Sequence, residues 1–227
     1  QKNGDSVVTG NVASTRLPSK KGKSSAIQSS DETTQATALK MTTARNNRFI
    51  RYEGNAVAWQ GSNRVTADSI EMDEDVAVMR ATGNVVSQFA DKPRKDATKQ
   101  PASKKKPAKK SAARQGAPVF TVVRSDKLVY TTDDQVAVFT SEGKAPARLE
   151  RAGMTVTGRE IRAFLNDSES EDDQSSFSRA VAEGAVEIVQ TAPGHTRNGT
   201  AEHADYYPDE GKIILEGGQP VFIDSIK

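Results

Sequence analysis

Apolar and polar residues alternate with a period of two along much of the chain, most clearly in the stretch Gly54–Phe89. Val76 and Val78, for example, are two residues apart, and the run that ends the stretch has the same spacing. This period is typical of a β-strand with one buried face, because successive side chains point to opposite faces. Polar turns at Gln60–Asn63 and Asp73–Asp75 separate the runs. The stretch therefore predicts short antiparallel strands joined by hairpin turns.

A glycine-headed motif repeats through the chain. Gly54-Asn55-Ala56-Val57 returns 29 residues later as Gly83-Asn84-Val85-Val86, and related glycines recur at Gly10, Gly143, Gly184 and Gly217 or Gly218. Without the low-complexity insertions, a unit of about 25–35 residues remains, and a repeat of that size indicates a stacked β architecture. A glycine in each unit fits a corner of the chain, because glycine tolerates a bulge or a positive φ. We therefore expect an all-β fold.

Two low-complexity segments interrupt the repeats. Residues 17–37 are rich in Ser, Thr, Lys and Gln, residues 92–118 are rich in Lys, Ala and Pro, and both are expected to be flexible. The predicted organisation is β-repeats over 1–91 with a flexible loop at 17–37, a disordered basic insertion over 92–118, and repeats of the same stack over 119–227. An apolar fraction of 35% and an aromatic fraction of 5% suit such a slender β-structure.

Charge is unevenly distributed. Between Lys92 and Arg114 there are ten basic residues and one acidic residue, whereas the rest of the chain has 22 basic and 29 acidic residues. The repeats are therefore acidic and the insertion is strongly basic. A tract of this kind is either a solvated linker or a site for anionic polymers and lipid head groups. No aromatic residue interleaves with these lysines, so base stacking is not offered and nucleic acid is not expected as a partner.

Residues that carry catalysis or bind metals are scarce. The chain has no Cys, and His195 and His203 are its two histidines. His203 and Asp205 would share one strand face, but these two side chains alone do not make a metal site. The acidic run Asp167–Asp173 lacks the ligand spacing of a calcium loop. No serine-hydrolase elbow, P-loop or zinc-protease motif occurs. We therefore expect no enzyme activity, no metal and no cofactor.

The beginning of the sequence has no secretory signal, and no apolar run of about 18 residues would form a membrane-spanning helix. Gln1 leads almost directly into the strand-like run Val7–Val12. We therefore expect the chain to be a segment of a longer protein, with its address and earlier repeats outside this sequence.

Short motifs recur in a fixed order along the chain: Tyr52–Val57, Val65–Asp68, Val76–Val78 and Gly83–Val85. This order of Gly-x-Val, x-Ala-Asp and Gly-Asn-Val resembles the OstA/LptA-like family of lipopolysaccharide-transport proteins, which includes LptA, LptC and the N-terminal domain of LptD. The segment Gly199–Tyr207, followed by Leu215–Pro220, is similar to the terminal unit of that family. The resemblance covers residues 38–89 and 119–223.

The resemblance implies an open β-jellyroll, a solenoid-like trough of antiparallel strands with an apolar inner face. Acyl chains of lipid A, the lipid part of lipopolysaccharide, would lie in the trough while the sugars stay in water. The physical reason is general, because each CH₂ group left in water costs about 0.8 kcal/mol. The family also implies a periplasmic location, either free or anchored through a segment outside this sequence.

Alternation predicts which side chains line the trough. The second and fourth positions after each glycine are small or apolar, and apolar pairs also precede several glycines. We expect the lining to include Val76, Val78, Val85, Val136, Val138, Val181, Val186, Ile188, Ile213, Leu215 and Phe222. Before the glycine the opposite face is apolar too, at Met79, Phe139 and Ile214, so alternation separates the two faces less well there. The alternative is that all of these residues simply form a hydrophobic core.

An open stack leaves an unpaired strand at each end, which favours strand addition by a partner. The candidate edges are Val7–Val12 and Pro220–Ile226. By resemblance, the partners would be other Lpt-type β-jellyroll proteins or a second copy of this chain. A competing hypothesis is a structural β-solenoid that binds an anionic envelope polymer through the basic insertion.

Overall fold

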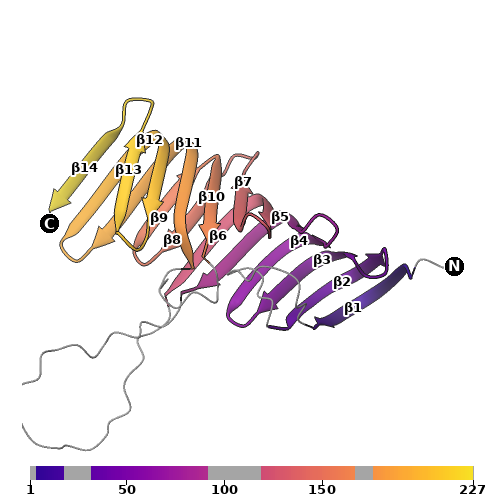
Figure 1. Ribbon diagram of the computed structural model, residues 1–227. Helices are drawn as coiled ribbons and strands as arrows, with labels where there is room; N and C mark the ends of the chain where they lie inside the picture. Colours follow the sequence, from indigo (N-terminus) through magenta and orange to yellow (C-terminus); the bar gives the residue numbers. More distant parts are fainter. Residues whose placement is uncertain (1–3, 18–31, 92–118, 167–175, 227) are drawn as a thin grey trace, which may run out of the picture.

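The computed structural model describes residues 4–17, 32–91, 119–166 and 176–226. Within these ranges it contains one antiparallel sheet of 14 strands and no helix (Figure 1). The strands are β1 Ser6–Arg16, β2 Thr34–Ala44, β3 Phe49–Gln60, β4 Asn63–Asp73, β5 Val78–Ala90, β6 Phe120–Thr131, β7 Val136–Thr140, β8 Ala147–Arg151, β9 Met154–Gly158, β10 Glu160–Leu165, β11 Phe177–Ala192, β12 His195–Tyr207, β13 Lys212–Glu216 and β14 Val221–Ile226. The predicted all-β fold, an open β-jellyroll of antiparallel strands, is confirmed.

The sheet is a meander in which strands pair with their neighbours in sequence. From β1 to β6 every strand pairs with the next one. Beyond β6, β7 and β8 both pair with β6, β9 and β10 both pair with β11, and β13 and β14 both pair with β12. Each of these three pairs is therefore one long strand that is interrupted near its middle.

A bulge bends the long strands at one level of the sheet. Between β5 and β6 the register shifts between Thr82 and Val85, where Gly83 and Asn84 have φ values of 77° and 49°. Similar shifts interrupt the β1–β2, β2–β3, β3–β4, β4–β5 and β11–β12 ladders. Such bulges bend a strand and increase its twist. A glycine with positive φ thus marks a corner inside β1, β3, β5 and β11, at Gly10, Gly54, Gly83 and Gly184, and not the boundary between two repeats.

The corners divide the sheet into two legs. Leg A contains β7, β10, β13 and the halves of the longer strands in register with them, and leg B contains β8, β9, β14 and the other halves. Side chains from the two legs meet: the Ser14 hydroxyl of leg B lies 2.7 Å from the Tyr52 hydroxyl of leg A. The hydrophobic core therefore lies between the legs, where alternate residues of both are buried.

Four residues expected to face inward do not: Val76 lies in the β4–β5 turn, and the other three lie on the outer face. Val76 is 54% exposed, and Val78, Val136 and Val138 occupy the half-buried outer phase of their strands. The positions that face inward in these strands are instead occupied by four other apolar residues, Met79, Ala81, Ala137 and Phe139. The prediction for these four valines is wrong because both faces are apolar before the corner, so alternation did not identify the buried one.

Part of the expected flexible loop is ordered. β2 begins at Thr34, inside the range 17–37, and pairs with both β1 and β3. Its Ala36 is 2% exposed, because it lies between Ser14 and Ala58 on the inner face of the sheet. The predictions for residues 18–31, the basic insertion 92–118 and the acidic run 167–173 fall outside the described residues.

Candidate functional site

The inner face of leg B forms one continuous row of side chains from the first strand to the last. Cross-strand pairing connects Ser14, Ala36, Ala58, Val65, Ser87, Val123, Leu149, Val156, Ile188, Gly199 and Phe222 in that order. Nearly all of them are small or apolar, and none carries a charge. An apolar surface therefore runs along the whole stack of leg B.

Leg A supplies a matching row that faces it. This row comprises Val8, Met41, Tyr52, Ile70, Ala81, Leu128, Phe139, Ile161, Ala182, Ala204 and Leu215. The outer face differs, because it carries ion pairs such as Arg51–Glu71 at 2.6 Å and Lys40–Glu53 at 2.8 Å. The two legs therefore enclose an apolar interior behind a charged exterior.

The remaining predicted lining residues lie in or beside this interior. Val85, Val186 and Ile188 are buried members of the core, and Ile213 and Leu215 pack against it from β13. Val181 is buried, but its side chain points to the opposite face of β11 from those of Ala180 and Ala182. Its cross-strand partner on β12 is Asp205. Phe222 continues the leg B row but is 63% exposed, because β14 is the last strand of the stack.

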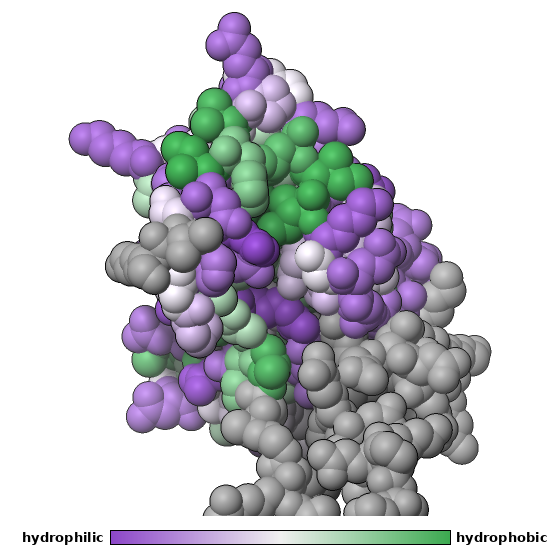
Figure 2. Space-filling view, turned by 90° about the vertical axis from the view of Figure 1, so that its left-hand side faces the viewer, coloured by the Kyte–Doolittle hydropathy of each residue, from purple (hydrophilic) through white to green (hydrophobic). Residues whose placement is uncertain are grey.

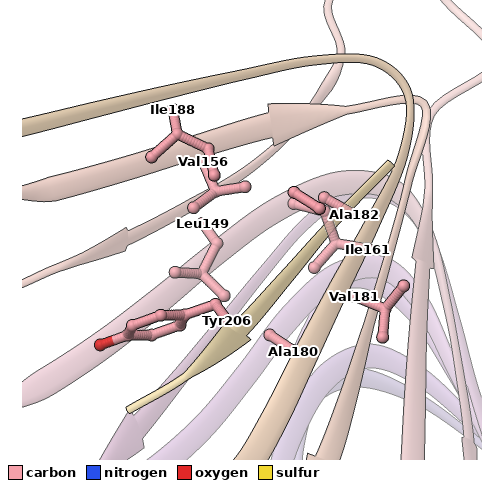
Figure 3. A pocket seen from close by; sticks show the side chains of 9 residues that line it. Leu149, Val156, Ile161, Ala180, Val181, Ala182, Ile188 and Tyr206 are labelled. Atoms are coloured by element: carbon pink, nitrogen blue, oxygen red, sulfur yellow. The ribbon is translucent and has the colours of Figure 1, made fainter. Parts of the chain in front are cut away.

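A small apolar cavity lies between the legs near the last strands (Figure 3). Leu149, Val156 and Ile188 line it from leg B, and Ile161, Ala180, Val181, Ala182, Ala204 and Tyr206 line it from leg A. Its volume is about 10 Å³, which is space for about one water molecule. An acyl chain needs far more room, so the legs must separate before this interior takes up a long apolar ligand.

Each end of the stack presents an edge strand with exposed apolar side chains. β14 exposes Val221, Phe222 and Ile223, and β1 exposes Val7 and Val8. Among the described strands, β14 pairs with β12 alone and β1 with β2 alone. Figure 2 looks at the molecule from the side where β14 lies in Figure 1, and it shows hydrophobic atoms gathered between polar ones. Such edges are templates for another strand.

Opposite the corners, two polar contacts join the tips of the legs. Arg16 at the end of β1 forms an ion pair with Glu74 in the β4–β5 turn. Farther along the stack, the backbone N–H of Ser176 in leg A donates a hydrogen bond of 2.9 Å to Asp91 Oδ1 in leg B. These contacts close the open side of the fold at two levels.

The second contact contains a nearly buried ion pair. Arg151 Nη2 lies 2.6 Å from Asp91 Oδ2, and the two side chains are 11% and 9% exposed. Burial alone would lower the pKa of Arg151, but the hydrogen bond and negative charge of Asp91 outweigh it, and the pKa is raised. Burial raises the pKa of the neighbouring Tyr206, although the positive charge of Arg151 opposes this shift. Both side chains therefore keep their protons, and Arg151 keeps its positive charge.

Each histidine lies beside an acidic side chain on a strand face. His203 Nε2 is 3.2 Å from Asp205 Oδ2, and Arg179 Nη2 is 2.6 Å from Asp205 Oδ1. His195 lies 3.7 Å from Asp224. No cluster of potential metal ligands occurs among the described residues. In the same part of the chain, no helix is long and apolar enough to cross a membrane.

Two parts of this site were not predicted from the sequence. Leu149 and Tyr206 line the cavity, and their place in the alternating pattern was a usable signal. Asp91 and Arg151 are 60 residues apart, and no local pattern connects them. Their meeting depends on the pairing of β6 with β8, in which Thr121 lies opposite Arg151.

Comparison with known proteins gives a family match over the first repeats. Residues 19–78 match the family model of the LptA/(LptD N-terminal domain) LPS transport protein. This match confirms the resemblance to the OstA/LptA-like family over residues 19–78. No curated protein matches the chain. Among solved structures, the chain is similar to LptH from Pseudomonas aeruginosa, the LptA homologous periplasmic component of the conserved lipopolysaccharide transport device. The identity is 14% and the TM-score 0.44, with 70% of this chain and 95% of LptH covered.

Proposed function

Because the chain carries a segment of the OstA/LptA-like lipopolysaccharide-transport family, we propose that it binds lipopolysaccharide and carries it through the periplasm. The acyl chains of lipid A lie between the two legs, and the sugars remain in water. The observation that carries this proposal is the pair of apolar inner rows, which run from β1 to the last strands without a charged side chain.

The proposal also names the lining. Val85, Val186, Ile188, Ile213, Leu215 and Phe222 contact the acyl chains, together with Leu149, Val156 and Tyr206 around the cavity. Continuity matters physically, because an acyl chain that slides along the stack loses about 0.8 kcal/mol for every CH₂ group that re-enters water. A stack without an apolar gap keeps this cost small at each step. The work is transfer without bond making, so no catalytic group takes part.

Strand addition at the ends extends the path. We propose that β1 and β13–β14 pair with edge strands of other Lpt-type β-jellyroll proteins or of a second copy of this chain. In support, both edges expose backbone groups, and Val7, Phe222 and Ile223 are more than half exposed. Pairing would bury these side chains and continue the inner rows into the partner.

A competition experiment tests the proposal. The protein is incubated with radiolabelled lipopolysaccharide, and the complex is isolated by gel filtration. Unlabelled lipid A should displace the label, and the delipidated polysaccharide should not, because the acyl chains carry the binding. Displacement by the polysaccharide but not by lipid A would overturn the proposal and favour a protein that binds anionic polymer.

A further inference from the structure

Asp91 and Arg151 lie where the interior meets the solvent. Arg151 ends β8 at the tip of leg B, and Asp91 directly follows β5 at the same tip. The Arg151 guanidinium is 5.5 Å from the centre of the Phe177 ring in leg A, and that ring is 6.1 Å from the ring of Tyr206. Tyr206 in turn lines the cavity between the legs. A positive charge thus lies at the rim of the apolar interior, and the rings of Phe177 and Tyr206 connect it to the cavity.

The geometry around Asp91 is that of an anion site. Arg151 Nη1 donates to Asp91 Oδ1 at 2.8 Å while Nη2 lies 2.6 Å from Oδ2, so both carboxylate oxygens meet the same guanidinium. The backbone N–H of Ser176 donates a third bond to Oδ1 at 2.9 Å. Thr121 Oγ1 accepts a further bond from Arg151 Nη1 at 2.9 Å and holds the guanidinium in place. The planar guanidinium can donate two parallel hydrogen bonds to a carboxylate or to a phosphate, because the oxygen spacing of both groups matches it.

We propose that Asp91 occupies the head-group site of the trough and that a lipid phosphate replaces it on Arg151. This inference rests on the proposed function and adds a specificity-determining residue to it. A phosphate has three acceptor oxygens and more negative charge than a carboxylate, so it competes well for Arg151 and the Ser176 N–H.

The exchange also opens the fold. The Ser176–Asp91 bond joins the tips of the legs, and moving Asp91 off Arg151 removes that bond along with the ion pair. Acyl chains then enter between Leu149 and Tyr206, which face each other across the cavity. The phosphate remains at the rim on Arg151, because a charge is costly to move into the apolar interior.

Two variants with opposite expected effects test this inference. Affinity is measured for two probes in the same detergent, diphosphorylated lipid A and enzymatically dephosphorylated lipid A. Arg151→Gln should weaken binding of the phosphorylated probe by about tenfold or more, as expected for the loss of hydrogen bonds to a charged group. Asp91→Asn should tighten it several-fold, because the internal competitor loses its charge. Neither variant should weaken binding of the dephosphorylated probe, because that probe has no phosphate to contact Arg151. Any tightening that comes from easier opening of the legs should be smaller than the change seen with the phosphorylated probe.

The matched control is Arg124→Gln. Arg124 lies in the same β6–β8 strand pair and forms an ion pair with Glu150, but it is exposed on the outer face. This variant should bind both probes like the wild type. Circular dichroism and thermal unfolding verify that each protein is folded; if Arg151→Gln does not fold, Asp91→Asn still decides, because it keeps Arg151.

The result that overturns the inference is an equal change for both probes, or no tightening of the phosphorylated probe by Asp91→Asn. Either result would mean that the pair only joins the legs. Failure of the proposed function looks different, because the wild-type protein would then bind neither probe.

Discussion

The ring of Phe89 meets the ring of Phe139 edge to face, with centroids 6.3 Å apart and an angle of 63° between the planes. Phe89 belongs to leg B and Phe139 to leg A, so this contact packs the two legs against each other in the middle of the stack. Both side chains are almost fully buried. The contact therefore fills the interior between the legs at this level of the stack.

Truncation of this contact should destabilise the fold strongly. We expect Phe139→Ala to lower the free energy of unfolding by about 3–5 kcal/mol, through lost burial and the cavity that remains. Val138→Ala is the control, because its side chain lies on the outer face and should cost less than about 1 kcal/mol. Urea unfolding of both variants checks this. Equal losses would contradict the assignment of the inner face.

The corner glycine in β5 should resist replacement. Gly83 has a φ of 77°, and a Cβ atom there would lie 2.2 Å from Asp68 Oδ2 and 2.9 Å from Asp68 Cβ. We expect Gly83→Ala to cost about 1–3 kcal/mol from the backbone conformation alone, with the steric conflict in addition.

Gly10→Ala separates the two contributions. Gly10 has a φ of 84°, but a Cβ atom added to it would meet no heavy atom within 4 Å, so this variant should show the backbone cost alone. Denaturant unfolding of the two variants gives the difference. A smaller loss at Gly83 than at Gly10 would contradict the close approach of Asp68.

The sequence predicts the buried face of a strand only where the two faces differ in polarity. After the corner, Val85 and Ile188 are buried on the inner face, and alternation identifies this face because the intervening positions there are more polar. Before the corner, Val78 and Met79 are both apolar, and only the register with β4 and β6 decides which is buried. The pairing of Asp91 with Arg151 is a tertiary contact and leaves no local trace in the sequence.

Asp205 should make stability depend on pH in the acid range. Burial would raise the pKa of Asp205, but hydrogen bonds from Arg179 and His203 outweigh it, and the pKa is lowered. A carboxylate with a lowered pKa stabilises the fold above its unfolded pKa of about 3.9, and this contribution is lost as the pH falls through the folded value.

Asp205→Asn should therefore be less stable than the wild type at pH 6, and the difference should shrink as the pH falls below about 4. Arg179→Gln removes the principal partner and should flatten the same part of the pH profile. Urea unfolding at a series of pH values measures both. A difference that stays constant with pH would show that Asp205 acts through packing and not through its charge.

The exposed edge of β14 should govern association between copies. We expect Phe222→Lys to weaken concentration-dependent self-association by about tenfold or more, because a lysine on an edge strand opposes strand addition. Val76→Lys is the control, since Val76 is also exposed but lies in the β4–β5 turn, away from both edges. Sedimentation equilibrium compares the two. Equal weakening by both would point to net charge as the cause, not strand pairing.

Photo-crosslinking at two adjacent residues tests the central claim most directly. Ile188 faces the interior and lines the cavity, whereas Glu187 is exposed on the outer face of the same strand. With a photoreactive amino acid at each position in turn, irradiation with lipopolysaccharide should give a strong adduct from position 188 and none above background from position 187. Equal labelling at both positions, or labelling from 187 alone, would contradict binding of acyl chains between the legs.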